Sequence, residues 1–332
     1  VFLALRSWLI SKDFSLKRVF WLTGGLTFLL SPVADNLSAA LLMGSVVMAV
    51  GGRTPEFVAL GCINVVVAAN AGGVFSPFGD ITSLMVWQAG HLNFADFFWL
   101  LPPALTNWLI PALLLSLKIP DGPPQAAHRQ QRMKKGALVV TGLFIATAAL
   151  SVSVHAQLGL PPVLGMMTGL GVLKLYGFYL SHHDPMLREL ELRQHHADTL
   201  SSTRDTKGDH IQVVRRFDIF RVVERASWDT LMFFYGVVLC VGGLATLGYL
   251  QLVSSELYGS LGSSSANLLI GLASSLVDNI PIMYAVLAMD QTLSTAEWLL
   301  VTLAVGTGGS LLAIGSAAGV ALMGQAAGIY TF

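Results

Sequence analysis

The chain has 332 residues, of which 54% are hydrophobic and only 11% are charged, and its mean hydropathy is +0.67. A typical soluble domain has about 25% charged residues, and segments such as 138–154 are apolar on every side, which excludes a soluble protein with polar helix surfaces. The 19 basic and 19 acidic residues cancel, so no general attraction to nucleic acid follows. The composition predicts an all-α polytopic membrane protein.

The first part of the chain, residues 1–118, is predicted to form part of a first repeat of membrane elements. Its apolar segment 20–50 is interrupted at Ser31-Pro32 and Asp35-Asn36, which leaves two arms of roughly a dozen residues, each too short to cross a membrane alone. This pattern predicts a re-entrant helical hairpin. Segment 57–89, interrupted by glycine and polar residues, predicts a broken transmembrane helix, and 94–117 is long enough to cross.

The second part of the chain is predicted to repeat this order after a polar linker. The predicted elements are a cytoplasmic linker at 119–135, two transmembrane helices within 136–180 (137–157 and 163–180), a cytoplasmic polar insert with an amphipathic helix at 181–226, and, within 227–332, a helix at 228–250, a hairpin at 266–289 and a broken helix at 298–323. Because the chain begins with Val1 rather than Met, we expect N- and C-terminal elements of the full protein to lie outside it. Cys62 and Cys240 both fall in apolar stretches and predict free, buried thiols.

The same Ser-x3-Asp-Asn pattern stands in both predicted hairpins, at Ser31 to Asn36 and at Ser274 to Asn279. All Lys and Arg residues lie at or before Arg225, and placing the basic segments in the cytoplasm puts the two links without basic residues, 91–95 and 159–162, outside. The two hairpins then enter the membrane from opposite sides. The sequence therefore predicts inverted-topology repeats.

Three carboxylates lie inside apolar segments: Asp35, Asp80 and Asp278. No Lys or Arg lies in the same elements, so their partner must come from solution. Two partners meet that need: a bound cation, or a proton, since desolvation disfavours the charged form of a carboxyl. An antiporter uses both in turn. The alternative is that Asp35 and Asp278 only cap the returning arm of each hairpin.

The interruptions also contain the oxygen atoms that a small hard cation such as sodium prefers. Their side chains are Asp35, Asn36, Asn70, Ser76, Asp80 and Thr82 in the first half, and Ser274, Ser275, Asp278, Asn279, Thr307, Ser310 and Ser316 in the second. Unwound backbone at Gly72, Gly73, Gly308 and Gly309 would add carbonyls. The glycine-rich run 306–319 lacks both nucleotide-binding patterns, so we expect no nucleotide and no cofactor besides transported ions.

Four stretches carry a resemblance to a known family: Ser31 to Ala40, Asn70 to Ser83, Trp228 to Leu231 and Ser275 to Pro281. The chain resembles the NhaD-type sodium/proton antiporters of bacteria, within the ion transporter superfamily. The resemblance implies two inverted repeats, each with a scaffold part and a transport part, a homodimer, and the bacterial cytoplasmic (inner) membrane. It also implies an ion- and proton-binding site formed by Asp35, Asn36, Asn70, Asp80, Thr82, Asp278 and Asn279, supported by Ser275, Ser310 and Ser316.

The expected function is exchange of cytoplasmic Na⁺ or Li⁺ for external H⁺, with metal and proton competing for Asp35, Asp80 and Asp278, and with no enzymatic step. Relatives in the superfamily carry dicarboxylates or arsenite, so the fold alone does not determine the substrate. The alternatives are a sodium-coupled anion symporter, an arsenite efflux carrier and a non-transporting membrane scaffold. Acidic hairpin tips without basic residues argue against an anionic substrate but do not exclude neutral arsenite.

Overall fold

The computed structural model describes residues 15–51, 54–120, 136–183, 228–289 and 291–330, and within these ranges its regular secondary structure is entirely helical. The chain divides into two compact units. The larger consists of Val1–Met133 with Gly236–Phe332, and the smaller is Lys134–Tyr235. Every residue of the candidate site described below belongs to the larger unit.

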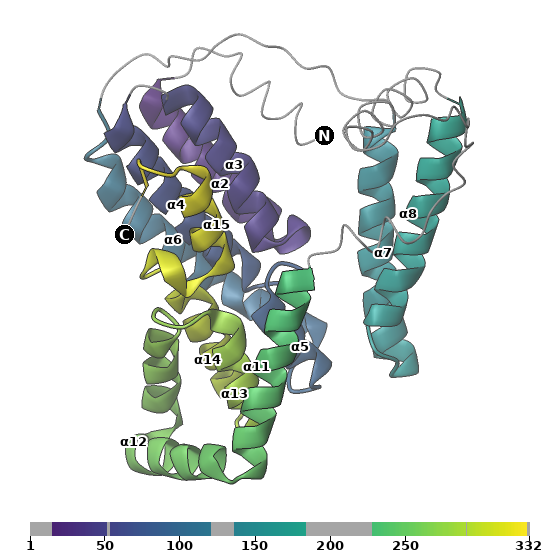
Figure 1. Cartoon of the computed structure of the whole chain (residues 1–332), viewed down its shortest axis with the longest axis vertical. Coiled ribbons are helices and arrows are strands. Elements are labelled where there is room, and N and C mark those ends of the chain that lie inside the picture. Colours follow the sequence, from purple (N-terminus) through teal and green to yellow (C-terminus); the bar gives the residue numbers. More distant parts are fainter. Residues whose placement is uncertain (1–14, 52–53, 121–135, 184–227, 290, 331–332) are drawn as a thin grey trace, which may run out of the picture. The chain divides into compact units, whose positions relative to one another are not determined.

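The first half of the larger unit is a group of packed helices (Figure 1). Its elements are α2 (Leu16–Ala34), α3 (Asn36–Gly51), α4 (Pro55–Gly73), α5 (Ile81–Gln88), the 3-10 helix η1 (Phe94–Leu100) and α6 (Leu101–Ser116). Helix α4 packs against α2, α3 and α6 and is buried along most of its length. Its apolar side chains therefore form the centre of the core, with Phe20, Met43 and Phe57 fully buried beside them.

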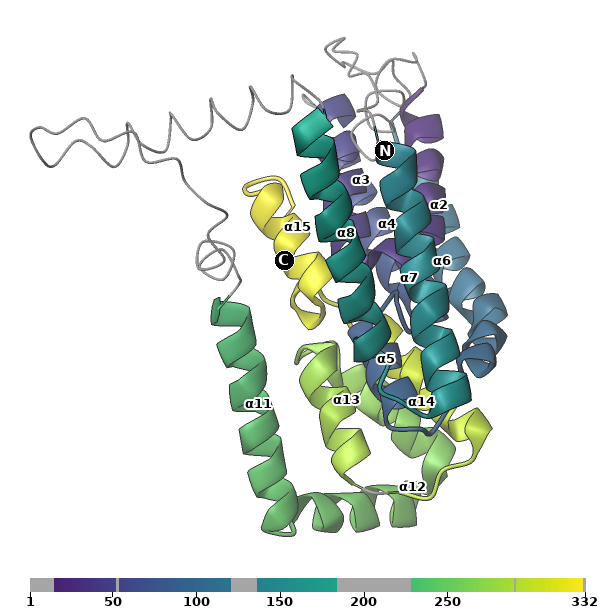
Figure 2. The ribbon, with the colours of Figure 1, turned by 90° about the vertical axis from the view of Figure 1, so that its right-hand side faces the viewer.

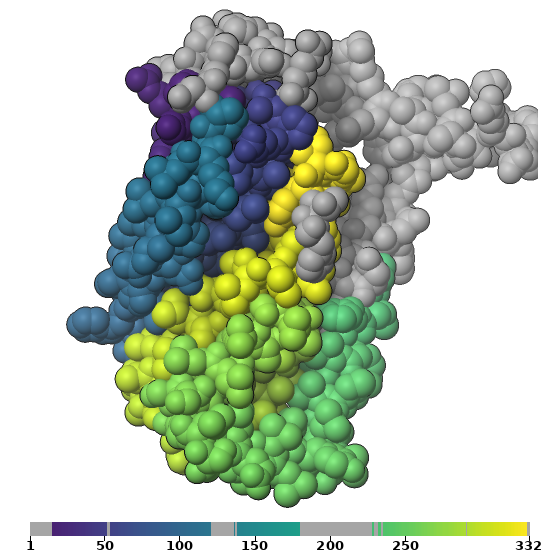
Figure 3. Space-filling model, turned by 90° about the vertical axis from the view of Figure 1, so that its left-hand side faces the viewer, coloured from purple at the N-terminus to yellow at the C-terminus, as the bar shows by residue number. Residues whose placement is uncertain are grey.

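The second half supplies α12 (Tyr249–Ala273), α13 (Asn279–Ala288), α14 (Thr295–Gly308), the short 3-10 helix η3 (Ala313–Gly315) and α15 (Ala317–Gln325). Helix α14 packs along α12, whereas α15 packs against α3 and α4 of the first half. Gly44 of α3 permits that contact, because a Cβ atom there would lie 2.1 Å from Cδ1 of Leu322. Figure 3 shows the C-terminal segment, in yellow, directly against the blue N-terminal helices.

The smaller unit contains a pair of apolar helices, α7 (Ala137–Leu158) and α8 (Val163–His183), which lie side by side (Figure 2). The turn between them begins at Gly159, whose φ of 63° is a left-handed conformation that glycine adopts readily. Close packing of the two helices depends on small residues, since a Cβ atom at Gly165 would lie 2.5 Å from Cα of Ser151.

Helix lengths support a membrane protein. Within the described residues, the helical segments Pro55–Gly73, Phe94–Ser116 and Leu138–Leu158 are long and apolar enough to cross a bilayer. Two of these agree with the predicted spans 94–117 and 137–157. The predicted span 163–180 corresponds to a shorter apolar stretch, Val163–Tyr179. Large apolar side chains on the surface, such as Trp99 and Leu114, suit a lipid environment.

Two predicted boundaries in the second half are wrong. The predicted helix 228–250 ends earlier, as α11 (Trp228–Thr246), because Gly248 adopts a left-handed conformation with φ 83° and the chain bends by 76° between α11 and α12. The first arm of the second predicted hairpin begins at Tyr249 rather than at 266, and it has a kink at Gly262, where φ is 73° and ψ is 159°. Serine and glycine residues before Ala266 had masked this helix in the sequence.

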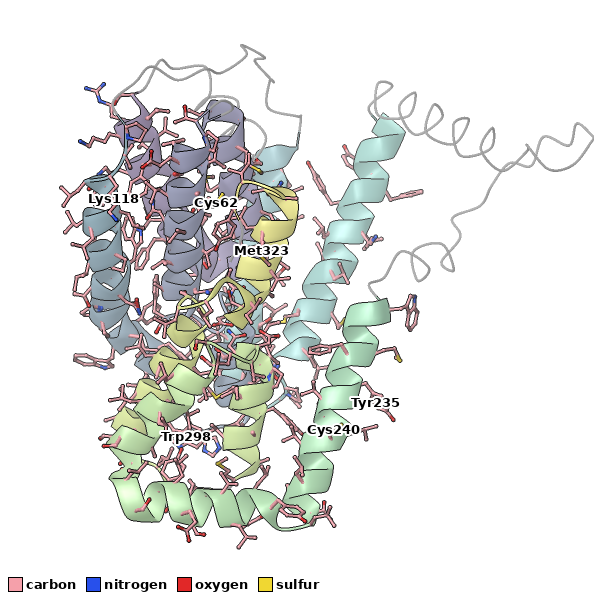
Figure 4. All side chains as sticks on the ribbon, turned by 60° about the vertical axis from the view of Figure 1, so that its left-hand side comes forward. Cys62, Lys118, Tyr235, Cys240, Trp298 and Met323 are labelled. Atoms are coloured by element: carbon pink, nitrogen blue, oxygen red, sulfur yellow. The ribbon has the colours of Figure 1, made fainter. Side chains whose placement is uncertain are left out.

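Other predictions concern segments that the structure describes only in part. The polar insert 181–226 lies outside the described residues from 184 onward, and the linker 119–135 from 121 onward. Both cysteines are free, but only Cys62 is buried; Cys240 on α11 is exposed, contrary to expectation (Figure 4). Met323 of α15 packs against the core cluster that contains Cys62.

Candidate ion-binding site

The interruption between α4 and α5 places two acceptor atoms in the interior. Asp80 caps the N-terminus of α5, and its Oδ1 accepts a hydrogen bond of 3.2 Å from the backbone N–H of Thr82. The Asp80 side chain is only 4% exposed and that of Thr82 is fully buried. Among the described residues, neither Oδ2 of Asp80 nor the Thr82 hydroxyl oxygen has a hydrogen-bond partner outside this pair of side chains. Buried polar atoms are normally paired, so these two oxygens are suited to an external ligand.

Gly306 of α14 leaves space beside these two oxygens. A Cβ atom at this position would lie 2.3 Å from Cγ1 of Val74, 3.0 Å from Oδ2 of Asp80 and 3.5 Å from the Thr82 hydroxyl oxygen, so the Val74 methyl group bounds this space. Helix α14 packs against both α4 and α5, so this face of Gly306 is directed at the interruption. The absence of a side chain at 306 therefore creates a cradle beside the carboxylate.

Asp278 brings a second negative charge to the same region. It is half-buried and stands at the N-terminus of α13, which packs against α5. Its side chain makes no capping hydrogen bond, and its Oδ1 is buried without a partner among the described residues. Its charge acts on the Asp80 carboxyl. Two neighbouring carboxylates in an apolar interior require a cation or a proton between them.

No basic side chain meets that need in the described part of the larger unit. Its lysine and arginine residues there are Lys17, Arg18 and Lys118, and all three are exposed, at the start of α2 and just beyond the end of α6. Lys118 is labelled in Figure 4. The compensating charge for Asp80 and Asp278 must therefore come from an ion or proton in solution.

A second polar cluster joins the two halves of the unit. The side-chain amide of Asn70 donates hydrogen bonds of 2.9 Å to the hydroxyl oxygens of both Ser310 and Ser316. Its own oxygen accepts a bond of 3.3 Å from the amide of Asn36. Ser316 in turn caps α15 by accepting from the N–H of Gly319. Four predicted site residues, far apart in the sequence, therefore form one network.

Asp35 differs from the other two acids. Its carboxylate is exposed and accepts hydrogen bonds from the Ser38 backbone N–H, at 2.8 Å, and from the Ser38 hydroxyl, at 2.7 Å. It therefore caps α3, as the capping alternative expected. Its backbone φ of 57° is a strained conformation for a residue other than glycine. Asp35 thus makes local capping bonds, whereas Asp278 keeps an oxygen without a partner among the described residues.

The remaining predicted residues have structural contacts. Asn279 is buried in the first turn of α13, and the Ser275 hydroxyl donates to the carbonyl of Leu272 at 2.7 Å. Glycines 72, 73, 308 and 309 allow close backbone contact: a Cβ atom at Gly72 would lie 2.4 Å from the Phe28 carbonyl oxygen, and one at Gly308 would lie 2.1 Å from that of Gly271. Gly72 and Gly308 thus hold each interrupted helix against the preceding arm, whereas Gly73 and Gly309 face Gly79 and Gly315 of their own interruptions. The prediction of unwound backbone is wrong for Gly72, Gly73 and Gly308, which lie within α4 and α14.

The sequence analysis did not identify Gly306 as a site residue, because it considered only side chains with ligand atoms and glycines expected to expose backbone carbonyls. The available signal was its position: it occupies the same place in the second interrupted helix as Asn70 does in the first.

Comparison with known proteins identifies the family of the chain. The family model described as CitMHS, citrate transporter, matches residues 1–306. The Na(+)/H(+) antiporter NhaD of Vibrio parahaemolyticus is 52% identical over 313 residues, covering 94% of this chain and 75% of the relative. That of Alkalimonas amylolytica is 51% identical over 334 residues, covering 100% and 68%. Sodium/proton antiporter 1 of Arabidopsis thaliana is 29% identical over 312 residues, covering 89% and 48%.

The chain is thus a member of the CitMHS family of multi-pass membrane transporters, which reside in the lipid bilayer and are not enzymes. Within that family it belongs with the NhaD antiporters, four of which are 51 or 52% identical to it. It spans 65 to 75% of the length of these relatives.

Proposed function

We propose that this chain carries the ion-exchange machinery of an antiporter that exchanges cytoplasmic Na⁺ or Li⁺ for external H⁺. The observation that carries the proposal is the pair of unpartnered oxygens on Asp80 and Thr82 beside the cradle at Gly306, with Asp278 as the second charge. Hard monovalent cations favour carboxylate and hydroxyl oxygens. The names of the NhaD relatives support Na⁺ and H⁺.

The proposed mechanism is competition. The metal binds while Asp80 and Asp278 are deprotonated, and protonation of these carboxyls from the other side removes the charge that holds it. Because the same oxygen atoms serve both ions, exchange is obligatory without any covalent step. Asp35, the residue that matches Asp278 in the first half, joins the competition from its capping position at α3.

Membrane topology, assembly and location are also part of the proposal. We propose that α2 with α3 and α12 with α13 form re-entrant hairpins of two inverted repeats, and that the full protein is a homodimer in the bacterial inner membrane. The short interval at Asp35 and the break at Asp278 support the hairpins, since unwound backbone at membrane depth needs a polar lining. Bacterial NhaD relatives support the location.

The family description raises citrate as a rival substrate, but the charges of the site oppose it. Citrate is an anion, and the described part of the larger unit has no buried lysine or arginine to compensate it. Two buried or half-buried carboxylates would instead repel it. An anion symporter would require basic side chains that the site does not have among the described residues.

The test is transport by the full-length protein in inverted vesicles from antiporter-deficient bacteria. The vesicles are acidified by respiration, and lumenal pH is recorded after addition of Na⁺, Li⁺ or K⁺. Alkalinisation by Na⁺ or Li⁺ should be lost in Asp80→Asn and in Asp278→Asn. The matched control is Asp96→Asn, because Asp96 only caps η1 and Asn can also accept that bond.

Three outcomes separate the alternatives. Absence of any cation response in well-expressed wild type would refute the proposal, and resistance to arsenite in the same cells would then point to arsenite efflux. Unchanged exchange in both site variants would leave a transporter whose ion site lies elsewhere. Loss of exchange in Asp96→Asn as well would show that the effect of the substitutions is not specific to the site.

A further inference from the structure

The two interrupted helices are matched copies with a consistent register. The Ser31 hydroxyl donates to the carbonyl of Ala69 at 2.6 Å, and the Ser274 hydroxyl donates to that of Val305 at 2.9 Å. Each serine opens a Ser-x3-Asp-Asn motif, so Ala69 matches Val305 and the next residue, Asn70, matches Gly306. The contacts of Gly72 with Phe28 and of Gly308 with Gly271 agree with this register, since each partner lies three residues before its serine.

The same register aligns the residues at the ends of the two interruptions. Four places after Asn70 stands Val74, and four places after Gly306 stands Ser310. Asp80 lies ten residues after Asn70, and Ser316 lies ten residues after Gly306. These two side chains cap α5 and α15, respectively, by accepting hydrogen bonds from backbone N–H groups. Ser310 and Ser316 are therefore the structural counterparts of Val74 and Asp80.

Positions 70 and 306 each face the opposite half of the larger unit. Asn70 contacts Ser310 and Ser316 through its amide, and a Cβ atom at Gly306 would contact Val74 at 2.3 Å and Asp80 at 3.0 Å. The two places are thus related by the repeat, and in each of them a residue of one half faces residues of the other half. We call the first, formed by Asn70, Ser310 and Ser316, the closed place, and the second, formed by Gly306, Val74, Asp80 and Thr82, the open place.

We propose that the amide nitrogen of Asn70 occupies in the closed place the position that the transported cation occupies in the open place, and that Gly306 is the residue that keeps the single cation place open. The inference rests on the proposed ion exchange and deepens it. It assigns a specificity-determining role to a glycine that has no ligand atom of its own.

The hydrogen-bond donors and acceptors of the closed and open places differ as this assignment requires. In the closed place, two neutral hydroxyl oxygens accept from an NH₂ group that the chain supplies, and both acceptors are satisfied at 2.9 Å. In the open place, a carboxylate replaces the capping serine and position 306 supplies no side-chain amide, so Oδ2 of Asp80 and the Thr82 hydroxyl oxygen have no partner outside their own pair among the described residues. A neutral amide suffices for the first place, whereas the second requires positive charge.

Two further consequences follow. The protein has one cation place of this kind per chain, although the repeat supplies two positions. A side chain at 306 should exclude the ion by occupying its space, even though Asp80 and Asp278 remain intact.

The experiment measures Na⁺ binding by purified full-length protein with ²²Na⁺, together with exchange in vesicles. Wild type should bind one Na⁺ per chain at this kind of place. Gly306→Ala is made in a Val74→Ala background, which removes the overlap with the valine side chain. We expect the Na⁺ concentration for half-maximal binding and exchange to rise by about tenfold or more, the loss expected when a buried charged group is deprived of its partner.

The controls are Val74→Ala alone and Gly324→Ala. Gly324 lies in α15, and a Cβ atom there meets nothing within 4 Å. Gly324→Ala should bind Na⁺ as wild type does, and Val74→Ala alone is the reference with which the Gly306 variant in that background is compared. Near-normal Na⁺ affinity in the folded Gly306 variant would overturn the inference.

The stoichiometry of wild type tests the inference without any variant, so a variant that fails to fold does not leave it untested. Two equivalent Na⁺ ions per chain would mean that the closed place also binds the metal, and would overturn the assignment of Asn70. Failure of wild type to exchange Na⁺ at all would instead refute the proposed function, which separates the two claims.

Discussion

Thr82 offers the sharpest test of whether the unpaired oxygens exist to bind an ion. Its side chain is fully buried, and among the described residues its hydroxyl has no partner other than the adjacent Asp80 carboxyl. An unsatisfied buried polar group costs about 1 to 3 kcal/mol. Replacing Thr82 with Val keeps the shape and removes that cost, so the ion-free Thr82→Val protein should be as stable as wild type or more stable, by up to about that amount.

Sodium binding should change in the opposite direction. At a Na⁺ concentration of about 100 times Kd, bound ligand adds about 2.7 kcal/mol to the free energy of unfolding. If loss of the hydroxyl ligand weakens binding about tenfold, Na⁺-dependent stabilisation falls by about 1.4 kcal/mol. Thermal unfolding of the detergent-purified protein, with and without Na⁺, measures both effects in one experiment.

The matched control is Thr27→Val. Thr27 is equally buried, but its hydroxyl donates to the carbonyl of Thr23 at 2.6 Å, so its removal should give no gain in stability and no change in the Na⁺ effect. The reasoning would be refuted if Thr82→Val lost as much stability as Thr27→Val in Na⁺-free buffer, or if it retained the full stabilisation by Na⁺.

Two further predictions concern the link between the halves and the competition between ions. Asn70→Ala removes three side-chain hydrogen bonds, so the free energy of unfolding should fall by about 1 to 3 kcal/mol, measured by thermal unfolding; unchanged stability would contradict the network. In vesicles, the Na⁺ concentration for half-maximal exchange should rise by about tenfold per unit of falling pH where one proton competes with the metal; a value independent of pH would contradict competition.

Local sequence features predicted the class of protein and the places where its helices are interrupted. Overall hydrophobicity and scarcity of charge predicted an all-helical membrane protein, because burial in lipid demands apolar side chains and internal backbone hydrogen bonds. The interruptions at Asp35, Asp80 and Asp278 were also predicted, since capping residues and glycine act on their own neighbours in the chain. The predicted interruption at Ser31-Pro32 was wrong, because α2 continues through Pro32 to Ala34. The error at 228–250 arose where Gly248 ends α11 within a continuous apolar run.

The composition of the site was predictable as a set of residues, but its geometry was not. Asp35, Asn70 and Asp278 were all identified as candidates, yet only the packing of the halves directs Asn70 to Ser310 and Ser316 and turns the carboxylate of Asp35 to Ser38. The partners of Asn70 are distant in the sequence, and the partner of Asp35 depends on which of several competing local hydrogen bonds forms. Neither choice follows from composition or spacing.

The sequence by itself determined that this protein is helical and membrane-embedded, and it identified Asp35, Asp80 and Asp278 as carboxylates within apolar segments. Only the tertiary structure decided which carboxylate oxygens are buried without a partner among the described residues, and which of them Gly306 lies beside. The physical reason is that Gly306 and Asp80 meet through the packing of α14 against α5, and the space between them exists only because a side chain is absent at that contact.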